Sequence, residues 1–361
     1  MDKINPKHYA FLILATCIVS LKTYPKVFIQ NGLRDSWVAV ITSSILILLF
    51  LIYVIKTCQK NNVYNLVEIF QGALGKTFGN VMLGLFCLTL FFTLVESAAV
   101  EASSMHTNML VATPVWFFIL FFVGPAIYTL KQDLVAIITV TLIGISLIII
   151  AGMNLAAMTH PYKDYSLLFP VFARGISGGF ILSILQTLGL FGCVSITFPY
   201  LVDVTSKKRL LLYAVLGILF VIQMQIVSTT GVIATFDISR INQMPYPKLL
   251  QTQLVSHFRF LEAGELFVML QIVGGWYIKY VVTFYALIKI LKGLKINTPY
   301  MIYIISLMVA ISAYLAGNDL FVLFRFLAYY TYIAFVGFVV IPTFVFAVFS
   351  FKNQKSPSGN V

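Results

Sequence analysis

Charged residues are scarce in this sequence. Asp, Glu, Lys and Arg together make up 10% of its 361 residues, whereas they account for about 25% of a typical soluble domain. Hydrophobic residues make up 60% of the chain. A soluble fold cannot cover so much apolar surface with so few charged side chains, so the composition predicts an all-α integral membrane protein.

The sequence also lacks the patterns of a metal, disulfide or catalytic site. Its four cysteines show no Cys-x-x-Cys spacing, and its four histidines lie scattered between apolar runs or near their ends. It contains no His-Glu-x-x-His motif, no phosphate-binding glycine loop and no recognisable nucleophile with a base. We therefore expect no metal, no cofactor and no enzymatic activity.

Acidic residues are half as numerous as basic ones, 12 against 24, which gives a net charge of +12. Binding of nucleic acid would require basic residues gathered on one soluble face, but here they lie between apolar runs. The excess therefore indicates membrane topology. The first apolar run contains a lysine and a proline and is followed by no small-residue cleavage site, so we expect a retained helix and not a signal peptide.

Long apolar runs predict ten membrane-spanning helices, because about 20 apolar residues cross a bilayer. Lys and Arg number 14 at the span ends on one side and 7 on the other, which places both termini in the cytoplasm. We expect one transmembrane domain over 1–361, with repeat one at 9–158, repeat two at 178–349 and a short cytoplasmic tail at 352–361. The expected spans are 9–28, 37–55, 80–103, 114–130, 134–158, 178–201, 210–234, 264–289, 299–316 and 321–349.

The first span carries a polar, helix-breaking interruption at residues 20–25, Ser-Leu-Lys-Thr-Tyr-Pro. A charged side chain at the bilayer centre costs about 2.5–3.5 kcal/mol, so Lys22 should face a partner or a water-filled cavity. Pro25 lacks an N–H and leaves backbone groups that lipid cannot satisfy. The matching span of the second half carries Gly189 and Gly192 at mid-depth. Interrupted helices in matching positions of two halves indicate a transporter-type site near the midplane.

Two charged residues of other spans belong to the same prediction. With a rise of about 1.5 Å per residue, Glu96 lies at a height similar to that of Lys22. Each would carry an unpaired-charge penalty alone, so we expect them to be partners. Lys279 lies slightly deeper, near the middle of the eighth span. The predicted ligand-binding residues are Ser20, Lys22, Thr23, Glu96, Gly189, Phe191, Gly192 and Lys279.

Several short motifs occur along the chain in a fixed order. They are Asn-Gly-Leu-Arg-Asp-Ser-Trp at 31–37 after Pro25, Leu-Gly-Lys-Thr-Phe-Gly at 74–79 after Glu68, Phe-Pro at 198–199 with Lys-Lys at 207–208, Tyr-Pro at 246–247, and Phe-Leu-Glu-Ala-Gly-Glu at 260–265 before Trp276. No single motif is decisive, but in their order and spacing they together resemble one known family, the B subunit of the spore germinant receptors of endospore-forming bacteria.

The resemblance implies the fold of the amino acid/polyamine/organocation superfamily. This fold is a LeuT-like five-plus-five inverted repeat, in which helices 1 and 6 are discontinuous around a site bordered by spans 3 and 8. The resemblance also implies a location in the spore inner membrane, an A-type subunit and a lipoprotein C-type subunit as partners, and a small nutrient germinant, often an amino acid.

This chain departs from the family at the first break. Ile18 and Ser20 stand where glycines are usual, and Lys22 stands where an apolar residue is usual. Lys22 then has three possible roles: it binds an acidic group of the ligand, neutralises Glu96, or occupies the place of a coupling cation.

Three functions are compatible with these patterns. The leading one is a membrane subunit that senses a small nutrient through a transporter-like central site and triggers germination. The alternative is a proton- or sodium-coupled secondary transporter of amino acids or polyamines. The third is an ion or water channel in which Glu96 and Lys22 set the selectivity.

Overall fold

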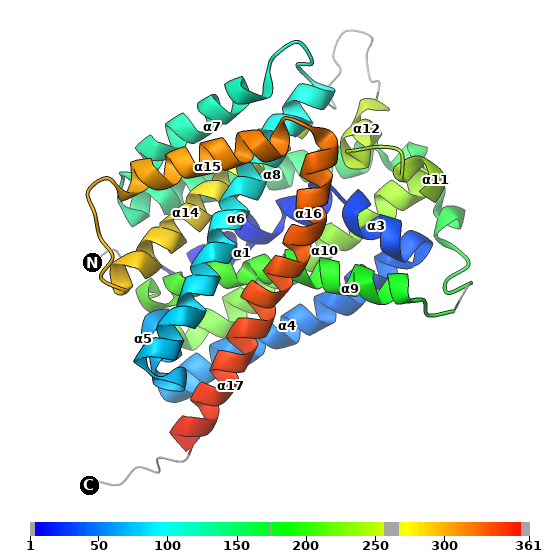
Figure 1. Cartoon of the computed structure of the whole chain (residues 1–361). Helices are drawn as coiled ribbons and strands as arrows, with labels where there is room; N and C mark the ends of the chain where they lie inside the picture. Colours follow the sequence, from blue (N-terminus) through cyan, green and yellow to red (C-terminus); the bar gives the residue numbers. More distant parts are fainter. Residues whose placement is uncertain (1–3, 174, 256–266, 355–361) are drawn as a thin grey trace, which may run out of the picture.

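The computed structural model describes residues 4–173, 175–255 and 267–354. Within these ranges the chain forms helices and no strand (Figure 1). The expected start of the eighth span at 264 and most of the expected tail at 352–361 lie outside the described residues. The composition therefore predicted the structural class correctly.

The first half of the chain consists of helices α1 to α8 with three short 3-10 turns. Their bounds are α1 Pro6–Cys17, α2 Val19–Thr23, α3 Lys26–Gly32, η1 Leu33–Asp35, α4 Ser36–Asn61, α5 Leu66–Leu74, α6 Lys76–Asn108, α7 Val115–Leu130, α8 Leu134–Met158, η2 His160–Tyr162 and η3 Tyr165–Leu168.

The second half begins at α9 and ends in α17. Its elements are α9 Gly178–Phe191, the 3-10 segment η4 Gly192–Asp203, η5 Lys207–Arg209, α10 Leu210–Thr235, α11 Ile238–Ile241, α12 Pro247–Gln253, the π-helical η6 Leu270–Gly274, α14 Gly275–Gly293, α15 Met301–Gly317, α16 Leu320–Ala334, the π-helical η7 Phe335–Val340 and α17 Ile341–Gln354. In Figure 1, α16 continues into α17 as one long rod that crosses α9 and α4.

Seven helical segments of the described chain are long and apolar enough to cross a membrane, which makes the protein a multi-pass membrane protein. The expected ten spans are met only in part, for two reasons. Helices α7 and α15 have 16 and 17 residues, fewer than the roughly 20 that a crossing needs, and the first apolar run is broken. The seven are Lys26–Asn61, Lys76–Asn108, Leu134–Met158, Gly178–Asp203, Lys207–Thr235, Phe267–Gly293 and Leu320–Lys352.

The first apolar run is interrupted twice, after Cys17 and before Pro25. Tyr24 has φ −125° and ψ 57°, outside the helical region, as expected for a residue that precedes proline. Gln225 of α10 binds the backbone at the interruption after Cys17, since its Nε2 donates to the carbonyl oxygens of Cys17 at 3.0 Å and Ile18 at 2.7 Å. The break is therefore stabilised by a side chain from a neighbouring helix.

The corresponding segment of the second half changes from α-helix to 3-10 helix between Phe191 and Gly192. Close packing explains the glycines here. A Cβ at Gly189 would lie 1.9 Å from the carbonyl oxygen of Thr331 in α16, and one at Gly192 would lie 2.8 Å from a methyl of Val339 in η7. These two positions allow α9 and η4 to approach the long rod of α16 and α17.

Candidate functional site

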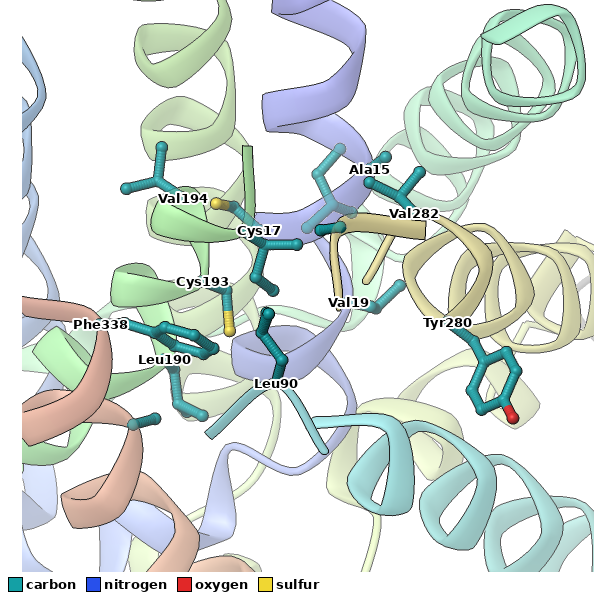
Figure 2. Close-up of a cluster of buried hydrophobic side chains, with 14 of the residues drawn as sticks. Ala15, Cys17, Val19, Leu90, Leu190, Cys193, Val194, Tyr280, Val282 and Phe338 are labelled. Atoms are coloured by element: carbon teal, nitrogen blue, oxygen red, sulfur yellow. The ribbon is translucent and has the colours of Figure 1, made fainter. Parts of the chain in front are cut away.

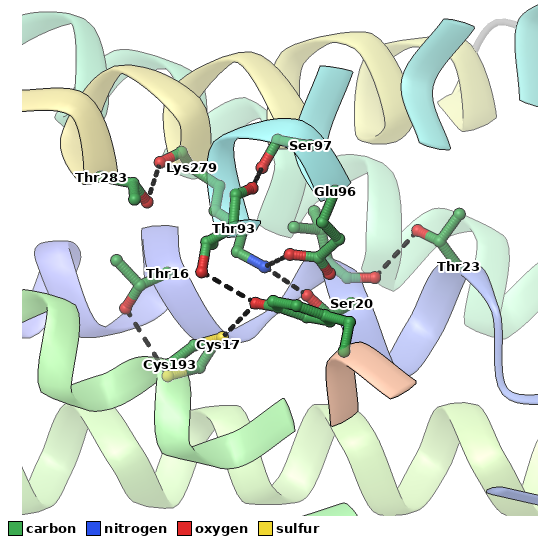
Figure 3. Close-up of polar contacts among 12 residues, drawn as sticks. Thr16, Cys17, Ser20, Thr23, Thr93, Glu96, Ser97, Cys193, Lys279 and Thr283 are labelled. Atoms are coloured by element: carbon green, nitrogen blue, oxygen red, sulfur yellow. Dashed lines mark hydrogen bonds and ion pairs between the residues drawn. The ribbon is translucent and has the colours of Figure 1, made fainter. Parts of the chain in front are cut away.

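A buried ion pair lies beside the break in the first helix (Figure 3). Glu96 of α6 and Lys279 of α14 are both 0% exposed, and Lys279 Nζ lies 2.7 Å from Glu96 Oε2. Lys279 Nζ also donates to Ser20 Oγ of α2 at 2.5 Å. Tyr24, which follows α2, donates its hydroxyl to the other oxygen of Glu96. The pair therefore connects α6 and α14 to both ends of the short helix α2.

The aromatic side chains around the pair shield it from water. Lys279 Nζ lies 5.1 Å from the ring centroid of Trp276, and the ring of Tyr24 stacks on the same tryptophan with centroids 6.2 Å apart. A buried ion pair is tolerated only when further hydrogen bonds satisfy its remaining donors and acceptors. Ser20 and Tyr24 provide them here.

The prediction that Lys22 and Glu96 are partners is wrong, because Glu96 pairs with Lys279. The depth estimate contained no information about rotation around the helix axis. Ser20 and Lys22 are two positions apart on α2, and side chains with that spacing point to nearly opposite sides of a helix. Ser20 therefore faces the ion pair, and Lys22 faces away from it.

Lys22 faces two cavities that share part of their lining. The larger has a volume of about 200 Å³ and is bounded by α8 and α10. The smaller, about 30 Å³, is lined by Thr23 and by residues of α12 and η6. Lys22, Lys248 and Gln271 line both. The lysine of the first break therefore borders a space in which a small solute can fit.

The glycine end of the predicted site is closed by packing. Figure 2 shows Cys17, Val19, Leu90 and Cys193 gathered in an apolar cluster beside the break. Phe191 is fully buried, and its carbonyl accepts a weak hydrogen bond from Cys17 Sγ at 3.8 Å. Gly189, Phe191 and Gly192 line neither of the two cavities that Lys22 borders.

The eight predicted residues thus fall into three groups. Ser20, Glu96 and Lys279 come together in the ion-pair cluster. Lys22 and Thr23 line cavities, and Thr23 also donates its hydroxyl to the Val19 carbonyl at 2.8 Å. The members that pack against neighbouring helices are Gly189, Phe191 and Gly192.

Sequence reasoning missed three neutral polar residues of the site. Tyr24, Gln225 and Gln271 each place a polar group at the break or at a cavity. An amide side chain within an apolar run is the signal that could have identified the two glutamines. Across residues 4–173, 175–255 and 267–354, no three His, Cys, Asp or Glu side chains gather in a way that could hold a metal ion.

Comparisons with known proteins place this chain in a family. Curated proteins give no match. A family model described as spore germination protein, of the spore permease type, matches residues 3–298, which is most of the chain. With its multiple apolar helices, the protein is a permease-like, multi-pass membrane protein. Since the matched region covers the broken helix, the ion pair and the cavities, the chain belongs to the spore germination protein family.

Proposed function

We propose that the protein is the B-type membrane subunit of a spore germinant receptor and that it senses a small nutrient, such as an amino acid. The observation that carries this proposal is the position of α2 between two different environments. Its Ser20 side is hydrogen-bonded to the buried Lys279, and its Lys22 side borders the cavities. A ligand that contacts Lys22 therefore acts on the helix that the ion pair holds.

The energetic requirement for sensing is differential affinity. A ligand shifts a conformational equilibrium only by as much as its affinities for the two states differ. A short helix with one side on the cavity and the other on the ion pair offers such a difference, because movement of α2 changes the contacts on both sides. We infer that ligand binding and the arrangement of Ser20, Glu96 and Lys279 are coupled through α2.

The proposed architecture is the ten-segment, five-plus-five inverted repeat with discontinuous helices 1 and 6. It is supported by the seven long segments, by the shorter apolar helices α7 and α15, and by the broken run from α1 to α3. We place both termini in the cytoplasm and the protein in the spore inner membrane. We also propose A-type and lipoprotein C-type subunits as its partners.

One observation favours the alternative, a coupled secondary transporter. Ionisable residues that pair inside a membrane domain mark ion and proton pathways in transporters. In that case the Glu96–Lys279 pair would separate and re-form as a proton enters from one side and leaves to the other in each cycle, and the chain alone would move labelled amino acid or polyamine into proteoliposomes. A sensor would show no such uptake.

The proposed function is tested in spores of the native host. The gene is deleted, and the deletion strain is complemented with the wild type, with Lys22→Ala or with the control Lys26→Ala. The release of dipicolinic acid from these spores is then measured after addition of each nutrient of a panel. Lys26 lies on α3 and lines neither cavity. We expect loss of at least one nutrient response on deletion, a shifted dose-response for Lys22→Ala and a normal one for Lys26→Ala. Deletion spores that respond normally to every nutrient would refute the proposal.

A further inference from the structure

Three lysines from three separate elements line the larger cavity. Lys22 lies on α2, Lys163 follows the turn η2, and Lys248 lies on α12. The other lining residues are apolar or neutral, and no described Asp or Glu is among them. The ion pairs found in the described part of the chain involve Lys279 and Lys289 instead. The cavity thus concentrates positive charge without a described carboxylate to balance it.

A buried amide donor points into the same space. Gln271 is only 9% exposed, and its Nε2 has no hydrogen-bond partner among the described residues. A Cβ at Gly152 would lie 3.2 Å from this Nε2 and 3.7 Å from Lys22 Nζ, so the two donors converge over Gly152. Buried donors nearly always have an acceptor, which indicates that the acceptor here is a ligand or solvent.

The other two lysines are positioned on the α10 side of the cavity. Lys248 Nζ donates to Gln251 Oε1 at 2.6 Å, and Gln251 is fixed in turn by donating to the carbonyl oxygen of Gly231 at 2.8 Å. A Cβ on Gly231 would lie 3.4 Å from Lys163 Cε, so Lys163 passes close to the same turn of α10. Lys163 and Lys248 are therefore near one another before any ligand is bound.

The pKa of Lys248 reflects the concentration of positive charge in the cavity. Burial, followed by the positive charges of Lys22 and Lys163, lowers the pKa of Lys248 to about 7. Burial also lowers the pKa of Lys163. A negative group placed among the three ammonium groups would remove this mutual repulsion.

We propose that this cavity binds an anionic group, a carboxylate or a phosphate, through Lys22, Lys163, Lys248 and Gln271 Nε2. Charge-assisted hydrogen bonds from ammonium groups to such oxygens are among the strongest in proteins. A volume of about 200 Å³ far exceeds the roughly 10–15 Å³ that a single water requires. Anion binding by the cavity does not depend on the proposed function. The identification of this anion with the sensed nutrient rests on the proposed function.

Two sources could supply the anionic group, an acidic solute or the headgroup of an anionic lipid. The lipid source is relevant because Met153, Phe220 and Val227, which line the cavity, are 68%, 37% and 40% exposed on the outer sides of α8 and α10. Both sources share the same recognition chemistry, and the experiment separates them.

The experiment uses the purified full-length chain and isothermal titration calorimetry with L-glutamate, L-glutamine and inorganic phosphate. We expect glutamate or phosphate to bind more tightly than glutamine, whose only carboxylate is balanced by its own ammonium group. Lys163→Gln and Lys248→Gln should each weaken that binding about tenfold or more, and Lys26→Gln should not. Gly152→Ala should also weaken it, since the added methyl crowds Gln271 without altering charge. Thermal unfolding checks that each variant is folded.

A second arm measures retention of phosphatidylglycerol against phosphatidylcholine by native mass spectrometry. If the wild type retains phosphatidylglycerol and both lysine variants lose it, the anion site is supported. The same result overturns the assignment of the site to a nutrient. No binding of glutamate, phosphate or phosphatidylglycerol, or binding that the variants leave unchanged, overturns the site. Variants that lose glutamate binding but germinate normally leave the site standing and contradict the proposed sensing role.

Discussion

The buried Glu96–Lys279 pair should be strongly non-additive in a double-mutant cycle. Glu96→Gln leaves an ammonium group buried without its counter-charge, and Lys279→Met leaves a buried carboxylate with only the Tyr24 hydroxyl. Removal of one partner of a buried pair costs about 3–5 kcal/mol. The double variant removes both charges, and its amide oxygen can still accept from Tyr24. We expect it to cost about 1–2 kcal/mol, the range of one lost hydrogen bond at Ser20.

The assay is equilibrium unfolding of the purified protein by increasing mole fractions of SDS in mixed micelles. A matched control is the pair Lys289–Asp203, whose side chains are 25% and 19% exposed. Partly exposed pairs contribute about 0–1 kcal/mol, so Lys289→Met should change stability little. If Glu96→Gln and Lys279→Met each cost less than about 1 kcal/mol, or if their effects simply add, the pair does not hold the break as described.

Three further predictions follow from other contacts. Gly189→Ala should destabilise the protein by about 1–3 kcal/mol through overpacking, while Gly84→Ala, where a Cβ meets nothing within 4 Å, should not; the SDS assay compares the two. Gln225→Leu should cost about 1–3 kcal/mol in that assay, because two carbonyls lose their donor. Glutamate affinity should fall as pH rises through 7, because Lys248 loses its proton there while glutamate keeps its charge; calorimetry with glutamate at pH 6 and 8 tests this, and an affinity that rises with pH would contradict it.

The sequence was sufficient to predict the all-helical membrane class and the interruption at Pro25, but not the interruption after Cys17. Composition determines the class, and Pro25 cannot continue a helix that lies in lipid. Relative position along a helix can also be estimated, since the rise per residue is fixed. These predictions depend on composition, on the position of a proline and on residue spacing, all of which the sequence contains directly.

The partner of Glu96 was not accessible in this way, because pairing depends on rotation around the helix axis. Lys22 and Lys279 were both candidates by depth, and only the packing of α2 against α6 and α14 selects Lys279. The glycines of α9 show a related ambiguity. A glycine permits close packing and ligand access equally well, and the carbonyl of Thr331 next to Gly189 decides for packing.

The lysine cluster was beyond sequence reasoning for a different reason. Lys163 and Lys248 lie in loops separated by more than eighty positions in the sequence. In the sequence they only contribute to the count of basic residues on the outer side of the membrane. Only the folding of α12 back against α10 brings them to the same cavity as Lys22. Loop conformation depends on long-range packing, which local pattern does not encode.

The number of lysines determines whether an anion could act as a switch. Changing a two-state equilibrium from 1:99 to 99:1 requires about 5.5 kcal/mol of differential binding. One hydrogen bond to a charged group contributes about 1.5–3 kcal/mol, so Lys22 alone is insufficient. Three such contacts made in only one state provide about 4.5–9 kcal/mol. An anion can therefore drive the transition only if α2, α12 and the loop at Lys163 converge on it in one state and separate in the other.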